Sequence, residues 1–256
     1  MALFKTSNPA LGENTFRGLS SAQYGGVIDE STRMTLNGTV NKTGILLVCA
    51  IATAAWTWRL FLQSRDFADV MPLMLVGALG GFIVAMVTVF KKEWSPVTAP
   101  IYALLEGLVL GGISALIETR YPGIAIQAVG LTFGTLFVLL LAYRSGLIPV
   151  TQKLRMGIVA ATGGIAVFYL FQMLLGFFGI YFNSINGAGA IGIAFSLFVV
   201  VIAALNLVLD FDFIERGVQA GAPKYMEWYG AFGIIVTLVW LYLEILRLLS
   251  KLRDRR

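Results

Sequence analysis

Long apolar segments dominate the chain, and short polar segments separate them. Each apolar segment is close to the ~20 residues that a helix needs to cross the hydrocarbon of a bilayer. Lipid offers no hydrogen-bond partner to a free backbone group, so each crossing segment is expected to be helical. The pattern predicts seven transmembrane helices, over residues 43–62, 70–90, 97–117, 124–143, 155–177, 189–209 and 228–249.

The two ends of the chain are polar. Residues 1–42 are rich in Ser, Asn, Gly and Thr, and no apolar core follows their first basic residue, so they do not resemble a cleaved signal peptide. We therefore expect three parts: a polar N-terminal cytoplasmic arm (1–42), a seven-helix transmembrane domain (43–249) and a basic C-terminal tail (250–256).

Composition supports an all-α membrane protein and narrows its chemistry. The chain is 58% hydrophobic and 13% charged, whereas soluble domains are nearer a quarter charged. It has no His and one Cys, Cys49. These counts exclude a disulfide within the chain, Cys- and His-based metal sites and Ser-His-Asp catalysis, so we expect no enzyme. The net charge of +5 indicates contact with lipid headgroups rather than with nucleic acid.

The distribution of Lys and Arg predicts the orientation, because these residues favour cytoplasmic loops. The loops after the first, third and fifth segments contain only Arg65 and Arg120. Seven basic residues occupy the other loops: Lys91, Lys92, Arg144, Lys153, Arg155, Arg216 and Lys224. We therefore expect a cytoplasmic N-terminus. Seven full crossings then put the basic tail outside, against the rule, and the alternative is a last segment that re-enters the membrane.

Two carboxylates lie at the end of the sixth apolar segment, where a charge is costly and often functional. Asp210 and Asp212 are two residues apart, so on a helix they point about 200° away from each other. Asp210 shares a face with Asn206, and Asp212 shares another with Arg216. We interpret Asp212 and Arg216 as a solvated ion pair. Asn206 and Asp210 are the functional candidates, with a hydrated carboxylate at the helix end as the alternative.

Other polar groups lie inside the apolar segments. Glu106 is near the middle of the third segment and should face the protein. It either has a structural role, paired with Arg59 or accepting a hydrogen bond from a hydroxyl, or it takes part in transport. Glu244 and Arg247 are three residues apart in the last segment, a spacing that allows a structural ion pair. Small residues at helical spacing, such as Gly77 with Gly81 and Gly107 with Gly111, predict close contacts between helices.

Four stretches taken together resemble the bacterial YccA-like branch of the Bax inhibitor-1 family, and the resemblance covers nearly the whole chain. They are Thr39-Val40-Asn41-Lys42-Thr43, Tyr102-Ala103-Leu104-Leu105-Glu106-Gly107, Asp210-Phe211-Asp212-Phe213-Ile214 and Tyr225-Met226-Glu227-Trp228-Tyr229-Gly230-Ala231-Phe232. The resemblance implies a last helix that is central in the bundle. It also implies a pH-sensitive calcium leak, in which two aspartates share protons at a cytoplasmic-side gate.

The resemblance assigns the first gate aspartate to Asp210, because Ile214 follows it by four residues as in the family pattern. The second position falls on Thr237, counted back from Arg247. Thr237 can donate a hydrogen bond but has no charge, so the proton-sharing pair is missing. Calcium prefers six to eight oxygen ligands, which makes Asp210 alone a weak calcium site.

We thus predict a calcium or cation leak in a bacterial inner membrane, gated by Asp210, Thr237 and Asn206 and influenced by pH. We expect no bound metal or cofactor, with Ca²⁺ as the candidate transported ion. The alternative is a protein that binds another membrane protein, such as an ATP-dependent membrane protease, through residues 1–42. An intramembrane enzyme is disfavoured, since the chain has neither His nor a second aspartate in a neighbouring segment.

Overall fold

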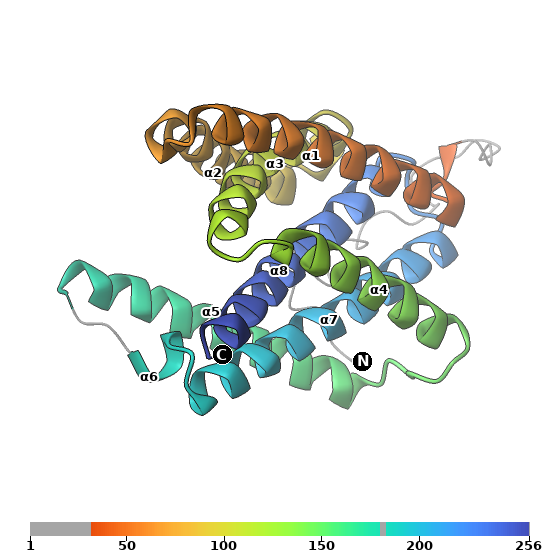
Figure 1. Cartoon of the computed structure of the whole chain (residues 1–256). Coiled ribbons are helices and arrows are strands. Elements are labelled where there is room, and N and C mark those ends of the chain that lie inside the picture. Colours follow the sequence, from red (N-terminus) through yellow and green to blue (C-terminus); the bar gives the residue numbers. More distant parts are fainter. Residues whose placement is uncertain (1–31, 180–182, 256) are drawn as a thin grey trace. The chain divides into compact units, whose positions relative to one another are not determined.

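The computed structural model describes residues 32–179 and 183–255, and almost all of them are helical (Figure 1). Seven helices in this part of the chain are long and apolar enough to cross a membrane. They are α1 (Leu36–Ser64), α2 (Phe67–Phe90), α3 (Ser95–Arg120), α4 (Ile124–Arg144), α5 (Gln152–Phe177), α7 (Ala190–Gln219) and α8 (Met226–Asp254). Two short helices, η4 (Lys92–Trp94) and α6 (Asn183–Asn186), complete the order. The predicted fold class is confirmed.

Several helices extend beyond the apolar segments, because polar caps rather than hydropathy set their ends. The Thr35 hydroxyl accepts a hydrogen bond from the Gly38 amide (3.0 Å), so α1 begins at Leu36 rather than near residue 43. The Asp66 carboxylate likewise accepts from the Ala68 amide and starts α2. At the other end of the chain, α8 continues to Asp254 as one uninterrupted helix of 29 residues. That continuity favours a full crossing over a re-entrant last segment.

The described residues form two compact units, and α7 and α8 contribute to both of them. Unit 1 contains Tyr121–Leu209 and Thr237–Arg256. Unit 2 contains Asp210–Val236 and the described part of Pro9–Arg120. The central position of the last helix stays a prediction.

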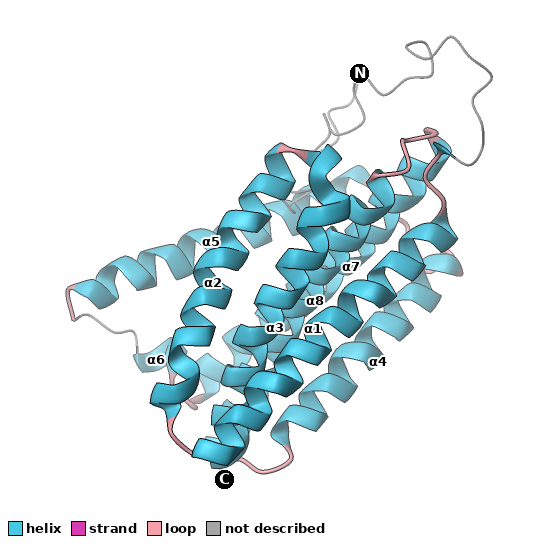
Figure 2. Cartoon of the chain, turned by 90° about the horizontal axis from the view of Figure 1, so that it is seen from above, coloured by secondary structure: helices cyan, strands magenta, loops and turns pink. Residues whose placement is uncertain are grey.

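In unit 2, α3 packs against both α1 and α2, and the three helices lie side by side (Figure 2). A Cβ at Gly107 would overlap the Ala50 carbonyl and the Thr53 hydroxyl of α1. The Thr53 hydroxyl also donates to the Leu104 carbonyl at 2.8 Å. Gly77 of α2 meets the Leu105 carbonyl of α3 in the same way. The predicted small-residue contacts between helices are therefore present in this unit.

In unit 1, apolar side chains of α5 and α7 form the core. Ile165 packs with Val199 and Ile202, and the Tyr169 and Trp240 rings pack against them. One polar link crosses this core: the Asn206 side-chain amide donates to the Thr162 hydroxyl at 2.8 Å. This hydrogen bond satisfies polar groups of two helices in surroundings where lipid offers no hydrogen-bond partner.

Candidate functional site

Asp210 lies in the second half of α7 and is buried, with 1% of its surface exposed. Asn206, one turn earlier, is 3% exposed and donates to the Ile202 carbonyl at 2.8 Å as well as to Thr162. Both members of the predicted stripe are thus turned away from lipid and water. A buried carboxylate needs a polar environment to offset the loss of hydration. Its assignment as a gate stays a prediction.

Asp212 is in a different environment from Asp210. Its carboxylate accepts a hydrogen bond from Arg216 Nη2 at 2.9 Å, and the Arg216 side chain is 37% exposed. The predicted ion pair at the helix surface is confirmed. The two carboxylates therefore differ in environment, because two residues apart on a helix they point in nearly opposite directions.

Thr237, at the position that the resemblance assigns to the second gate carboxylate, is 3% exposed in α8. Its hydroxyl is uncharged, and it can donate or accept a hydrogen bond. Its part in a gate stays a prediction.

Glu106 is half-buried in α3 and faces α2, where its Oε2 lies 3.3 Å from the position that a Cβ on Gly81 would take. A pair with Arg59, one of the alternatives for this residue, is absent from the part of the chain that the structure describes. The next residue, Gly107, faces α1, so Glu106 points about 100° away from that helix. Arg59 is exposed and precedes Phe61, which packs near Ala115 rather than near Glu106. A long basic side chain near a helix end reaches the membrane surface without a partner.

Glu227 is the most deeply enclosed carboxylate in unit 2, with 0% of its surface exposed. It accepts hydrogen bonds from the Thr35 amide (2.9 Å) and hydroxyl (2.8 Å), and it forms ion pairs with Lys42 and Lys224. A Cβ on Gly38 would overlap the carboxylate, so a larger residue there would displace Glu227 from its present position. Local spacing does not predict this cluster, because Glu227 stands in the sequence only as an acidic residue in the first turn of a helix.

The segment before α1 is held in place by backbone hydrogen bonds to the loop between α7 and α8. The Met34 amide donates to the Ala222 carbonyl at 2.7 Å, and the Lys224 amide donates to the Thr32 carbonyl at 2.9 Å. Arg33 and Pro223 form the corresponding antiparallel bridge. The Glu227 cluster therefore fixes the beginning of α1 to the beginning of α8. Residues 1–31 of the predicted arm lie outside the described residues.

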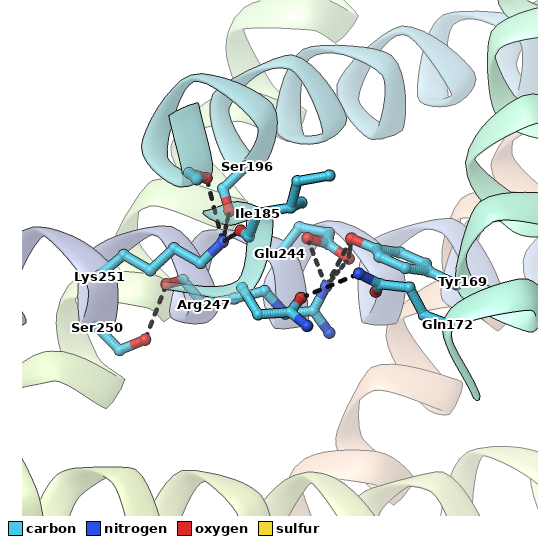
Figure 3. Close-up of polar contacts among 10 residues, drawn as sticks. Tyr169, Gln172, Ile185, Ser196, Glu244, Arg247, Ser250 and Lys251 are labelled. Atoms are coloured by element: carbon cyan, nitrogen blue, oxygen red, sulfur yellow. Dashed lines mark hydrogen bonds and ion pairs between the residues drawn. The ribbon is translucent and has the colours of Figure 1, made fainter. Parts of the chain in front are cut away.

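In unit 1, the predicted Glu244–Arg247 pair is present at 3.0 Å and includes a third residue (Figure 3). The Tyr169 hydroxyl of α5 donates to Glu244 Oε1 at 3.0 Å and accepts from Arg247 Nη1 at 2.6 Å. The guanidinium also lies 5.1 Å from the centre of the tyrosine ring, a cation–π distance. The pair thus joins α8 to α5.

Lys251, predicted as part of a basic tail, is a buried residue of α8 in unit 1. Its ammonium donates to the Ile185 carbonyl (2.7 Å) and the Ser196 hydroxyl (2.9 Å), as Figure 3 shows. It also donates to the Gly192 carbonyl (3.1 Å). All three protons are satisfied by neutral oxygens. Burial of an ammonium is tolerated only with such complete pairing.

Arg155 is a second buried cation that the sequence reasoning assigned to a loop. Because α5 begins at Gln152 after its Thr151 cap, Arg155 lies in the first turn of a helix and is buried. Neighbouring Lys153 is exposed. Hydropathy alone does not predict that Arg155 is buried while Lys153 is exposed.

The described residues contain no group of three or more His, Cys, Asp or Glu side chains that could hold a metal ion.

Comparison with known proteins gave one match. The model of a family described as Bax inhibitor 1 like matches residues 8–254, which is nearly the whole chain. No curated protein and no solved structure matches the chain.

Proposed function

This multi-pass membrane protein belongs to the Bax inhibitor 1 like family, and from that premise we propose that it forms a passive leak pathway for calcium or another cation. Asp210 is the residue that controls the pathway from the cytoplasmic side. The proposal includes a bacterial inner-membrane location with the N-terminus in the cytoplasm. It assigns no catalytic role to any residue.

The burial of Asp210 is the observation that supports this function most directly. A carboxylate that is 1% exposed in an apolar helix is costly unless it serves the protein. Asn206 on the same face extends the polar stripe toward the middle of the helix. Asp212, two residues away, forms a surface ion pair with Arg216 and has no part in the pathway.

Thr237 limits how far the family mechanism applies to this chain. A threonine cannot share a proton with Asp210 as a second carboxylate does, so the strong coupling between two like charges is absent. We therefore propose that one carboxylate sets the response to pH, and that this response is shallower than that of a paired site.

The second candidate function is binding and modulation of another membrane protein through residues 1–42. The described end of that arm, residues 32–35, is tied to the loop between α7 and α8 by backbone hydrogen bonds and by Glu227. A partner bound to the arm would therefore act on the start of α8. Co-purification that survives deletion of residues 1–31 would contradict this version.

The leak is tested by reconstituting the full chain in liposomes that contain a calcium-sensitive dye. We expect calcium entry above that of empty vesicles, and a change in its rate in Asp210→Asn. Asp212→Asn is the matched control, because it removes the same charge two residues away on the same helix. We expect this control to behave like the wild type.

Two results would contradict the proposal. The first is calcium entry no faster than in empty vesicles at every pH from about 5 to 8, the interval in which folded proteins are commonly most stable. The second is an equal effect of the two substitutions, which would assign the effect to surface charge. Replacing external calcium by potassium or sodium identifies the ion.

A further inference from the structure

A polar pocket of about 340 Å³ lies in unit 1, outside the stripe that contains Asp210. The second half of α5, the short helix α6 and the last turns of α8 line it. The lining residues are Tyr169, Gln172, Asn186, Arg247, Ser250, Lys251 and Asp254. All three elements contribute near one end of the long helices. Such a position in a membrane protein coincides with lipid headgroups.

Arg247 presents unused hydrogen-bond donors to this pocket. Its Nη1 is occupied by Glu244 and Tyr169. Its Nη2 and Nε donate to no atom of residues 32–179 or 183–255, and the side chain is 46% exposed. The interaction with Glu244 and Tyr169 fixes the plane of the guanidinium. One edge of the guanidinium is therefore held in place and still available, in the geometry that suits phosphate oxygens.

Asn186 supplies a second donor from the opposite wall. Its side-chain oxygen accepts from the Gln172 amide at 3.4 Å, which turns the Asn186 nitrogen outward. That nitrogen makes no hydrogen bond to the described residues. Arg247 of α8 and Asn186 of α6 thus bring donors from two elements to the lining of one pocket.

The charges at the pocket balance, because Arg247 and Lys251 are basic and Glu244 and Asp254 are acidic. Lys251 donates only to neutral oxygens. The unused donors of Arg247, rather than the net charge, therefore favour an acceptor group such as a phosphate. Asp254, the one carboxylate in the pocket lining, accepts a hydrogen bond from the Tyr121 hydroxyl. A phosphodiester has one negative charge and two free acceptor oxygens.

Apolar side chains flank the pocket on α5. Met173, Leu174 and Phe177 are exposed, with Phe177 80% exposed. They follow Gln172 directly, so apolar and phosphate-binding surfaces meet at the same end of α5. This combination is typical of a site for a phospholipid, whose headgroup and acyl chain bind side by side.

We propose that the pocket between α5, α6 and α8 binds the phosphodiester of a phospholipid headgroup. Arg247 donates through Nη2 and Nε, Asn186 donates through its side-chain amide, and the acyl chain lies along Met173 and Phe177. The bound lipid connects α5 to α8, in addition to the Tyr169–Glu244 hydrogen bond.

Native mass spectrometry of the full chain in detergent, titrated with dioleoylphosphatidylglycerol, tests the proposal. Arg247→Lys keeps the charge opposite Glu244 but loses the flat edge of the guanidinium. We expect it to weaken lipid binding about tenfold, the loss of one charge-assisted hydrogen bond. Asn186→Ala leaves the ion pair intact and should weaken binding severalfold. Arg144→Lys, at an exposed helix end in the same unit, is the matched control and should not change binding.

Three further probes identify the source of the phosphate. Dioleoylphosphatidylcholine, with the same diester, should bind with similar affinity. Dioleoylglycerol, which lacks phosphate, should not bind, and millimolar inorganic phosphate should not displace the lipid. Equal binding of dioleoylglycerol, displacement by inorganic phosphate, or wild-type affinity in both Arg247→Lys and Asn186→Ala would each overturn the proposal.

Discussion

Substitution of Glu227 by Gln should release the segment before α1 from the loop between α7 and α8. Glutamine keeps the shape of the side chain and can still accept one hydrogen bond from Thr35. It cannot balance the charges of Lys42 and Lys224. The expected result is local opening of residues 32–38 without loss of the helical fold.

The size of the effect follows from the burial of each group. Removing one member of a fully buried ion pair costs about 3–5 kcal/mol. Glu227 is 0% exposed, but the side chains of its partners Lys42 and Lys224 are 17% and 47% exposed, so water relieves part of the cost. Half-exposed Lys224 adds no more than about 1 kcal/mol. We therefore expect a loss of about 3 kcal/mol, near the lower end of the range for buried pairs.

Hydrogen exchange measured by mass spectrometry on detergent-solubilised protein is the suitable assay. The Thr35 amide donates to Glu227 and the Met34 amide donates to Ala222, so one peptide reports on both. A loss of about 3 kcal/mol raises their exchange rate roughly 100-fold, since each 1.4 kcal/mol is a factor of ten. Labelling of Cys49 on α1 by a thiol-reactive dye should stay slow if the opening is local.

The control is Asp212→Asn, which breaks a partly exposed ion pair in the same unit and should leave this peptide unchanged. If Glu227→Gln and Asp212→Asn show the same exchange in residues 32–38, the reasoning from burial is refuted. If the double variant Glu227→Gln, Lys42→Met is more stable than Glu227→Gln alone, the cost arises from the stranded ammonium.

Four other substitutions give distinct outcomes. Gly107→Ala should lower the thermal unfolding midpoint in detergent, at a cost of about 1–3 kcal/mol from overpacking against Ala50. Gly130→Ala, where no atom lies within 4 Å, should leave the midpoint unchanged or raise it. Thr237→Asp should make the pH dependence of calcium entry into liposomes steeper, and an unchanged profile would contradict the assigned position. Lys251→Met should destabilise unit 1 by about 2–4 kcal/mol, because three buried acceptors lose their donor, measurable as faster hydrogen exchange near Gly192.

Local spacing was enough to predict the helices and two of the ion pairs. The segment ending at residue 209 is long and apolar, so its crossing helix follows from hydropathy. Asp212 with Arg216, and Glu244 with Arg247, are four and three residues apart, where helical geometry alone brings side chains together. The burial of Asp210 also agrees with the stripe that it forms with Asn206.

The remaining polar contacts join residues far apart in the sequence, so no local sequence pattern predicts them. Glu227 binds Thr35 across a separation of 192 residues, and Lys251 meets Ser196 across 55. In the sequence, Lys251 has the appearance of a solvated tail residue. The pair of Glu106 with Arg59, one of the alternatives that the sequence leaves open, is absent from the described residues, because the rotation of α3 directs Glu106 toward α2.

The contact between Thr35 and Glu227 also imposes an order on biogenesis. The ribosome makes Thr35 and Lys42 early, and Glu227 follows only after another 192 residues. At bacterial and eukaryotic elongation rates of about 5–20 residues per second, that interval lasts roughly 10–40 s. During this time α1, α2 and α3 enter the bilayer with the Lys42 ammonium still unmatched. The Glu227 cluster of unit 2 can form only after the beginning of α8 has been synthesised. The emergence of α8 is therefore the last step in the assembly of this unit.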